Sequence, residues 1–167
     1  MLLAMKGYNN KYARLTLTEI IFTGRLTDIS LSTLIEDLLI DGNDINFISP
    51  EVQISNTKNE IINVLETFDY IDLTIAYNYF NGLGINIPRL FCNMGIENGK
   101  LEILLFFDLK DLEGTTYKTI IDKLRDWCIK FKEHYNFSYM RCQLDNGDKE
   151  EFYFDCNGLG PEYNKIR

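Results

Sequence analysis

Apolar and polar side chains alternate with a period of two over Tyr70–Phe80. The alternate positions that are apolar or aromatic are Ile71, Leu73, Ile75, Tyr77 and Tyr79. The positions between them include Asp72, Thr74 and Asn78. Because successive side chains of a strand point to opposite sides, this pattern predicts a strand with one buried face and one solvated face. Half-buried strands of this kind are typical of antiparallel sheets.

A hairpin is predicted after this strand. Its arms are Pro88–Gly95 and Lys100–Asp108, and they are joined at Glu97-Asn98-Gly99. The Asn-Gly pair favours a tight turn because both residues tolerate a positive φ. The second arm is apolar on both sides toward its end, so we expect it to be a central strand of the sheet.

Four further extended segments complete the predicted sheet. Ala13–Thr23 alternates like the strand above, and Ile45–Ile54 also has an extended pattern. Phe137–Leu144 and Glu151–Cys156 form a last hairpin across a polar turn. The residues after Gly158 are expected to form a short tail.

Three segments have the period of amphipathic helices: residues 30–40, a short stretch that begins at Thr57, and about 115–134. Thr33 with Glu36 has the spacing of a capping box in the first helix, and Thr57 opens the second helix with the same motif. The residues expected to face the core are Leu31, Leu34, Ile35 and Leu38 in the first helix, Ile61, Val64, Leu65 and Phe68 in the second, and Ile120, Leu124, Trp127, Cys128 and Phe131 in the third.

These elements predict a single α+β domain over residues 1–167, a mainly antiparallel sheet with about three helices packed on it. No linker, low-complexity segment or composition break divides the chain. Three helices can cover only one face of such a sheet, so the other face is either solvated or functional. The tetrapeptide Asn-Gly-Leu-Gly occurs at 81–84 and at 157–160, which fits either a worn duplication or a repeated turn signal.

The chain is acidic. It has 25 Asp and Glu against 17 Lys and Arg, a net charge of −8, which argues against binding to nucleic-acid phosphates. Most of the excess lies in two segments: residues 41–80 hold seven acids and one base, and residues 145–155 hold five acids and one base. Local charge of this kind raises the association rate with a basic partner.

No residue pattern indicates catalysis, a metal site or a cofactor. Cys92, Cys128, Cys142 and Cys156 form no Cys-x-x-Cys motif, and we expect reduced thiols that are buried where they fall on apolar stripes. His134, the only histidine, follows Cys128 by six residues, which places the two on different faces of a helix. We therefore expect no enzyme activity, no metal ion and no cofactor.

The sequence also bears on the compartment. No apolar run reaches the ~18 residues of a membrane-spanning helix. The segment Met1–Lys6 lacks the basic start of a signal peptide, and its apolar run is short. We therefore expect a cytoplasmic protein with no membrane partner.

The C-terminal third resembles a known class of protein. A long helix that ends in Trp127-Cys128-Ile129-Lys130-Phe131 is followed by Tyr135-Asn136-Phe137, an acidic hairpin and the segment Glu151–Pro161. Over residues 100–163 this layout is similar to that of small acidic immunity proteins that accompany polymorphic bacterial toxins. The resemblance implies a cytoplasmic protein without catalysis that binds a cognate toxin domain and blocks its active site or its activation.

Our first hypothesis is a binding protein that neutralises a cognate, basic toxin by occluding it through an acidic, partly aromatic surface. The predicted contact residues are Asp145, Asp148, Glu150, Glu151, Tyr153 and Asp155, with Asp69 and Asp72 as a second group. The alternative hypothesis is a regulatory or small-ligand-binding α+β domain that uses the open face of the sheet as its pocket. A hydrolase built on scattered carboxylates is the third. The sequence leaves the oligomeric state open.

Overall fold

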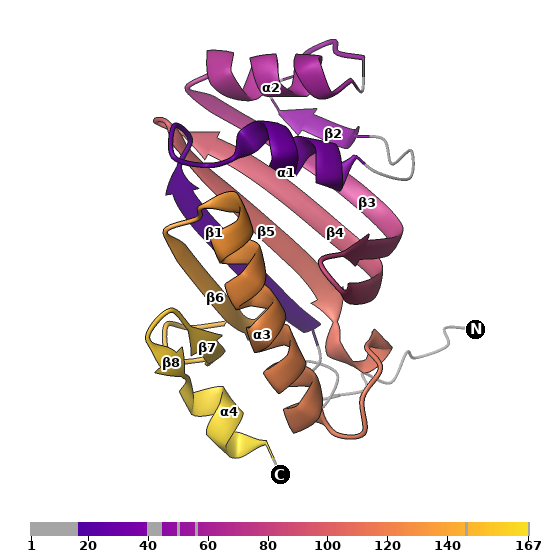
Figure 1. The fold of residues 1–167 in the computed structure, drawn as a ribbon, viewed down its shortest axis with the longest axis vertical. Coiled ribbons are helices and arrows are strands. Elements are labelled where there is room, and N and C mark those ends of the chain that lie inside the picture. Colours follow the sequence, from indigo (N-terminus) through magenta and orange to yellow (C-terminus); the bar gives the residue numbers. More distant parts are fainter. Residues whose placement is uncertain (1–16, 40–44, 50, 56, 146, 167) are drawn as a thin grey trace, which may run out of the picture.

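The structure, a computed structural model, describes residues 17–39, 45–49, 51–55, 57–145 and 147–166. Within these residues, eight strands form one antiparallel sheet in the order β2-β3-β4-β5-β1-β6-β7-β8 (Figure 1). The strands are β1 Leu17–Arg25, β2 Ile45–Ser49, β3 Tyr70–Gly82, β4 Ile85–Glu97, β5 Lys100–Asp108, β6 Tyr139–Leu144, β7 Phe152–Asp155 and β8 Gly158–Leu159. The helices are α1 Leu31–Leu38, α2 Lys58–Thr67, α3 Tyr117–Tyr135 and α4 Pro161–Lys165, with a 3₁₀ turn, η2, at Leu109–Asp111.

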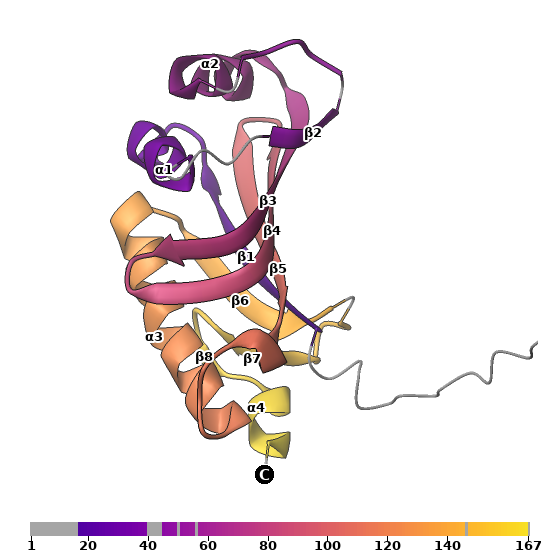
Figure 2. The same ribbon diagram turned by 90° about the vertical axis from the view of Figure 1, so that its right-hand side faces the viewer.

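Helices α1, α2 and α3 all lie on one face of the sheet (Figure 2). The short helix α4 packs against β7 at the lower end of the molecule (Figure 1). The predicted α+β fold, a mainly antiparallel sheet with about three helices packed on it, is therefore confirmed. We call the sheet face opposite α1, α2 and α3 the open face.

The hydrophobic core lies between the sheet and the three helices. Phe22 of β1 is fully buried, and its ring packs against Trp127 and Phe131 of α3, with ring centroids 6.2 and 4.5 Å away. The predicted inward residues of α1 and α3 are all buried. Alternation along most of the sheet therefore sends one set of side chains into this core and the other set to the open face.

The hairpin of β4 and β5 is confirmed. Asn98 and Gly99 form its turn with φ angles of +50° and +74°, which is the left-handed backbone that an Asn-Gly pair adopts at low cost. β5 lies between β4 and β1, so the prediction of a central strand is also confirmed.

The β3–β4 hairpin changes face partway along its length. Tyr77 and Phe80 are both buried although they lie three positions apart, and Tyr79, which the alternation places inward, is 65% exposed. β4 makes the same change on the opposite strand around Arg89, whose φ is +54°. The prediction for Tyr79 is wrong because both strands interrupt their alternation at the same level. The end of the hairpin curls over toward α3 as a result (Figure 2).

The helix starts follow the predictions only in part. α1 begins after Ser30, so the capping box of Thr33 and Glu36 is wrong. Thr57 caps α2 as predicted, since its hydroxyl oxygen accepts a 3.4 Å hydrogen bond from the backbone N–H of Glu60.

Two segments of the predicted strands differ from the structure. In Ile45–Ile54, only β2 is a strand; residue 50 lies outside the described residues. Residues 13–16 of the first predicted strand also lie outside them. The expected C-terminal tail is wrong, because β8 and α4 follow β7.

The two Asn-Gly-Leu-Gly segments have different conformations. In the first, Leu83 and Gly84 have positive φ angles of +51° and +85°, and they turn β3 into β4. In the second, Gly158 has a φ of +140° and leads into β8 and α4, with Gly160 at −92°. The same four residues therefore form two different turns, so their conformations give no support to a duplication.

Candidate functional site

The predicted contact residues lie at two places on the sheet. Most belong to the β6–β7 connection and β7, whereas Asp69 and Asp72 lie at the start of β3. β4, β5, β1 and β6 separate β3 from β7, so these two strands lie roughly 24 Å apart across the sheet. Tyr153 is only 5% exposed and lies in the core, so its side chain is not on the surface that a partner would contact.

We call Asp148–Glu151 the acidic turn. The backbone N–H of Glu151 donates to the carbonyl oxygen of Asp148 over 2.9 Å, and the Glu151 carboxylate accepts from the N–H of Asp148 over 3.0 Å. Arg141 of β6 donates to the carbonyl oxygen of Lys149 over 2.6 Å. These bonds hold the backbone of the turn, while the side chains of Asp148 and Glu150 remain exposed.

Two other predicted acids are bonded within the chain. The Asp72 carboxylate accepts a 2.8 Å hydrogen bond from the Tyr70 hydroxyl, and this bond raises the pKa of Tyr70. The Asp155 carboxylate accepts a 2.7 Å bond from the backbone N–H of Asn157. By their strand positions, both carboxylates are on the open face, at its two sides.

The open face has an apolar centre. Phe91 of β4 lies opposite Phe106 of β5, and Leu104 of β5 lies opposite Ile21 of β1. Phe91 is 50% exposed, and the other three are partly exposed. We call these four side chains the central patch. None of the four was predicted as a contact residue, although the apolar run on both faces of β5 was a signal for them.

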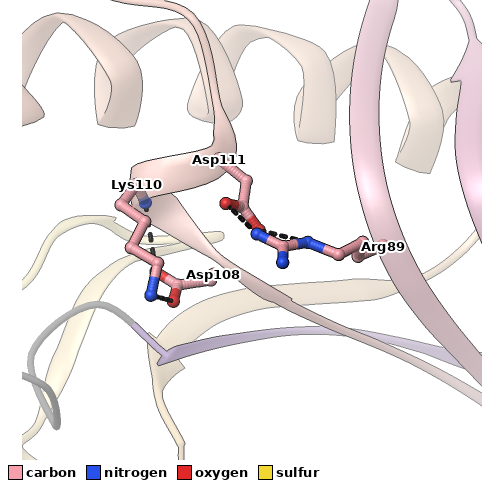
Figure 3. Close-up of polar contacts among 4 residues, drawn as sticks. All are labelled: Arg89, Asp108, Lys110 and Asp111. Carbon is pink, nitrogen blue, oxygen red and sulfur yellow. Dashed lines mark hydrogen bonds and ion pairs between the residues drawn. The ribbon is translucent and has the colours of Figure 1, made fainter.

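A groove of about 350 Å³ lies at the end of the β3–β4 hairpin. It runs between the hairpin, the η2 turn and the first half of α3, and its lining includes Tyr79, Pro88, Leu112, Glu113, Ile120 and Lys123. Arg89 makes an ion pair with Asp111 beside it, and Lys110 pairs with Asp108 at 2.7 Å (Figure 3). The nearby Asp108 carboxylate raises the pKa of Lys110. The four charged side chains beside the groove therefore form ion pairs with one another.

The thiols and the histidine have the environments of structural residues. Cys92, Cys128 and Cys142 are buried, as predicted, and Cys156 is exposed. Burial raises the pKa of Cys92 to about 12 and that of Cys128 well above its ordinary value, which disfavours the reactive thiolate.

His134 lies in the last turn of α3, as predicted, with Nε2 3.9 Å from an Asp37 carboxylate oxygen.

Among the described residues, no three His, Cys, Asp or Glu side chains are grouped to hold a metal ion. None of the helices in the described ranges is long and apolar enough to cross a membrane.

Comparison with protein families decides the class of protein. The family model of the PABL017 Cdi1I immunity protein matches residues 16–157. The chain belongs to this immunity protein family. The match runs from β1 through β7, so it includes the acidic turn and the open face. The predicted resemblance to immunity proteins is confirmed over a longer part of the chain, and with it the prediction of a binding protein that neutralises a toxin.

A solved structure has the same fold as this immunity protein. It is a chain of the 1.75 Å crystal structure of the toxic C-terminal tip of CdiA from Pseudomonas aeruginosa in complex with immune protein. The TM-score is 0.63 at 18% sequence identity, and the alignment covers 87% of this chain and 97% of the other. A search of curated proteins gave no match.

Proposed function

We propose that the protein neutralises the toxic C-terminal domain of a cognate CdiA-like protein by occluding it, and that the acidic turn steers this encounter. The observation that carries the proposal is the exposure of Asp148 and Glu150 on a backbone that Arg141 and Glu151 hold in place. Fixed surface charge raises the rate at which a partner of opposite charge associates. The partner surface that fits this turn is therefore basic.

The proposed mechanism needs no chemistry from this chain. The thiol of Cys128 is buried and held in its neutral form by a raised pKa, and His134 lies on the rim of the helix layer near Asp37. We further propose that the protein acts in the cytoplasm, a reducing compartment in which its four free cysteines would keep their thiols. Inhibition then follows from coverage of the toxin surface alone.

The first experiment tests the function itself. A CdiA-like toxin gene is first sought immediately upstream, the chain is co-expressed with the toxin domain encoded there, and growth is measured. We expect growth to be restored by the wild-type chain and a stoichiometric complex to be recovered. Toxicity that persists while the chain is folded and abundant would overturn the proposal. A co-purified metabolite in place of a protein partner would favour a ligand-binding domain.

The second experiment tests the acidic turn. Asp148→Lys with Glu150→Lys reverses two exposed side chains without removing the Glu151 carboxylate that braces the turn. Asp126→Lys with Glu133→Lys, on the exposed side of α3, is the control with the same change in net charge. At low salt we expect the turn variant to associate about tenfold more slowly and the control to differ little from wild type. Equal association rates would remove the turn from the interface.

A further inference from the structure

We infer that the central patch of the open face is the buried core of the toxin interface, and that it accepts a toxin surface with an apolar centre ringed by Lys and Arg. This inference rests on the proposed function and names the part of the molecule that performs it. The acidic turn would act on the approach of the toxin, and the patch would hold the complex together.

The first argument is the contiguity of the patch. Strand register aligns Phe91 with Phe106, and Leu104 with Ile21, in adjacent rows across β4, β5 and β1. Opposite residues on neighbouring strands are close enough for their side chains to touch. The patch is therefore one apolar surface, and helices α1, α2 and α3 lie on the other face of the sheet (Figure 2). Phe91, at 50% exposure, is a large aromatic side chain that binding could bury.

The second argument is the polar surround. Gln143 donates a 3.0 Å hydrogen bond to the Glu19 carboxylate on one side of the patch, and Asn93 donates a 3.2 Å bond to the Thr74 hydroxyl on the other. These polar side chains already bond to one another, so they border the patch in fixed positions. An apolar centre within a polar rim is the usual anatomy of a protein interface.

The third argument is charge, which selects the occupant. Three rows of residues that run across the strands of the open face contain Phe91, Leu104 and Glu102, one in each row. In these three rows, strands β1 and β3–β7 place four acids and one base on the open face. They are Glu19, Asp72, Glu102 and Asp155, against Arg141. Arg141 is already occupied, since it bonds to the acidic turn and its guanidinium lies 4.5 Å from the centre of the Phe152 ring in β7.

The same charge argues against a second copy of the chain on this face. Two copies would bring like-charged rims together, and each chain carries a net charge of −8. A toxin surface with Lys and Arg around an apolar centre would instead match the rim. The patch is also large enough to contribute: with its margins it spans roughly 14 Å across three strands and roughly 14 Å along them. This flat area of roughly 200 Å² is about a quarter of what one partner contributes to a standard interface.

The test is Phe91→Thr, because threonine suits a strand and removes the ring. Leu159→Thr is the matched control: Leu159 is 47% exposed, and it lies opposite Phe154, a fully buried residue of the core. Binding is measured with the purified toxin domain of the co-expression experiment. We expect Phe91→Thr to raise the Kd about tenfold or more through faster dissociation, and Leu159→Thr to change it by less than about twofold.

The outcomes separate this inference from the proposed function. If the wild-type chain binds and protects but Phe91→Thr binds equally well, the inference is wrong and the proposed function stands. If Leu159→Thr weakens binding as much as Phe91→Thr, the patch has no special role. Ile21→Thr is a second variant in case Phe91→Thr does not fold. A wild-type dimer that Phe91→Thr separates would assign the patch to a second copy and overturn the inference.

Discussion

The indole N–H of Trp127 donates a 2.9 Å hydrogen bond to the backbone carbonyl oxygen of Gly82, 45 residues earlier in the chain. The bond joins the middle of α3 to the tip of the β3–β4 hairpin. Phe80 of the same hairpin packs edge-on against the indole, with ring centroids 6.2 Å apart. The curled end of the hairpin is thus attached to the helix layer by one polar and one aromatic contact.

Trp127→Phe should loosen the hairpin tip. The variant removes the donor to the Gly82 carbonyl oxygen, and the loss of such a partner costs about 1–3 kcal/mol. Hydrogen exchange should rise at residues 80–87 more than elsewhere in the sheet. Tyr135→Phe removes a 2.7 Å bond to Asp37 from the same helix and serves as the control. Equal protection of the hairpin in both variants would contradict the role given to the indole.

Arg89→Gly should be more stable than Arg89→Ala, by about 1 kcal/mol in urea unfolding. Both variants remove the ion pair with Asp111, but only glycine adopts the φ of +54° at this position without cost. Asn93 is an ordinary strand residue of β4 and serves as the control position. There, Asn93→Ala should be more stable than Asn93→Gly. If the glycine and alanine variants ranked in the same order of stability at positions 89 and 93, the backbone of Arg89 would not be strained.

Thr116→Ala should destabilise the protein by about 1 kcal/mol. The Thr116 hydroxyl oxygen accepts a 3.2 Å bond from the N–H of Thr119 and so caps α3. Ser30 precedes α1 without such a bond, so Ser30→Ala should have a smaller effect. Thermal unfolding of the two variants measures the difference, and a larger loss for Ser30→Ala would contradict the assignment of the caps.

The protein should lose stability at alkaline pH. Burial raises the pKa of the Cys92 thiol from 9.0 to about 12, and it raises the pKa values of Tyr77 and Tyr153 above their ordinary 10.0. Above about pH 9–10 the unfolded chain releases these protons while the folded chain keeps them. The stabilisation is therefore complete below about pH 9 and falls as the pH rises, by up to about 1.4 kcal/mol per pH unit for each group.

Urea unfolding at pH 7.5, 9.5 and 10.5 measures this decline. Cys92→Val replaces the thiol with an apolar group and removes one titrating site. The variant should therefore lose less stability between pH 9 and 10.5 than the wild type does. A free energy of unfolding that stays level over this range would show that the buried thiols and phenols do not titrate on unfolding.

Local patterns in the sequence were sufficient for much of the fold. The Asn98-Gly99 turn and the core stripe of α3 were predicted correctly because turn chemistry and helical period act over a few residues. The inward position of Tyr79 was predicted wrongly because its alternation is interrupted together with that of the facing strand. That coupling between two strands has no signal in either strand alone.

The candidate site was harder to predict for a related reason. The acids of the turn and of β3 were visible as charge runs, but the strand order that places Asp72 and Asp155 on one face depends on long-range pairing. Phe91 and Ile21 are 70 positions apart in the chain. They belong to one patch only because β5 pairs with β4 on one side and with β1 on the other. The acidic segments therefore indicated two of the four rim acids, Asp72 and Asp155, but neither Glu19 and Glu102 nor the centre of the proposed interface.

The position of β1 has a consequence for the timing of synthesis. Thr18 of this strand lies opposite Phe107 on one side and Leu144 on the other. The first strand of the sheet to leave the ribosome is thus completed by segments translated much later, and such long-range pairing is slow to form. The centre of the sheet therefore closes around β1 only after Leu144 has left the ribosome, late in the translation of the chain.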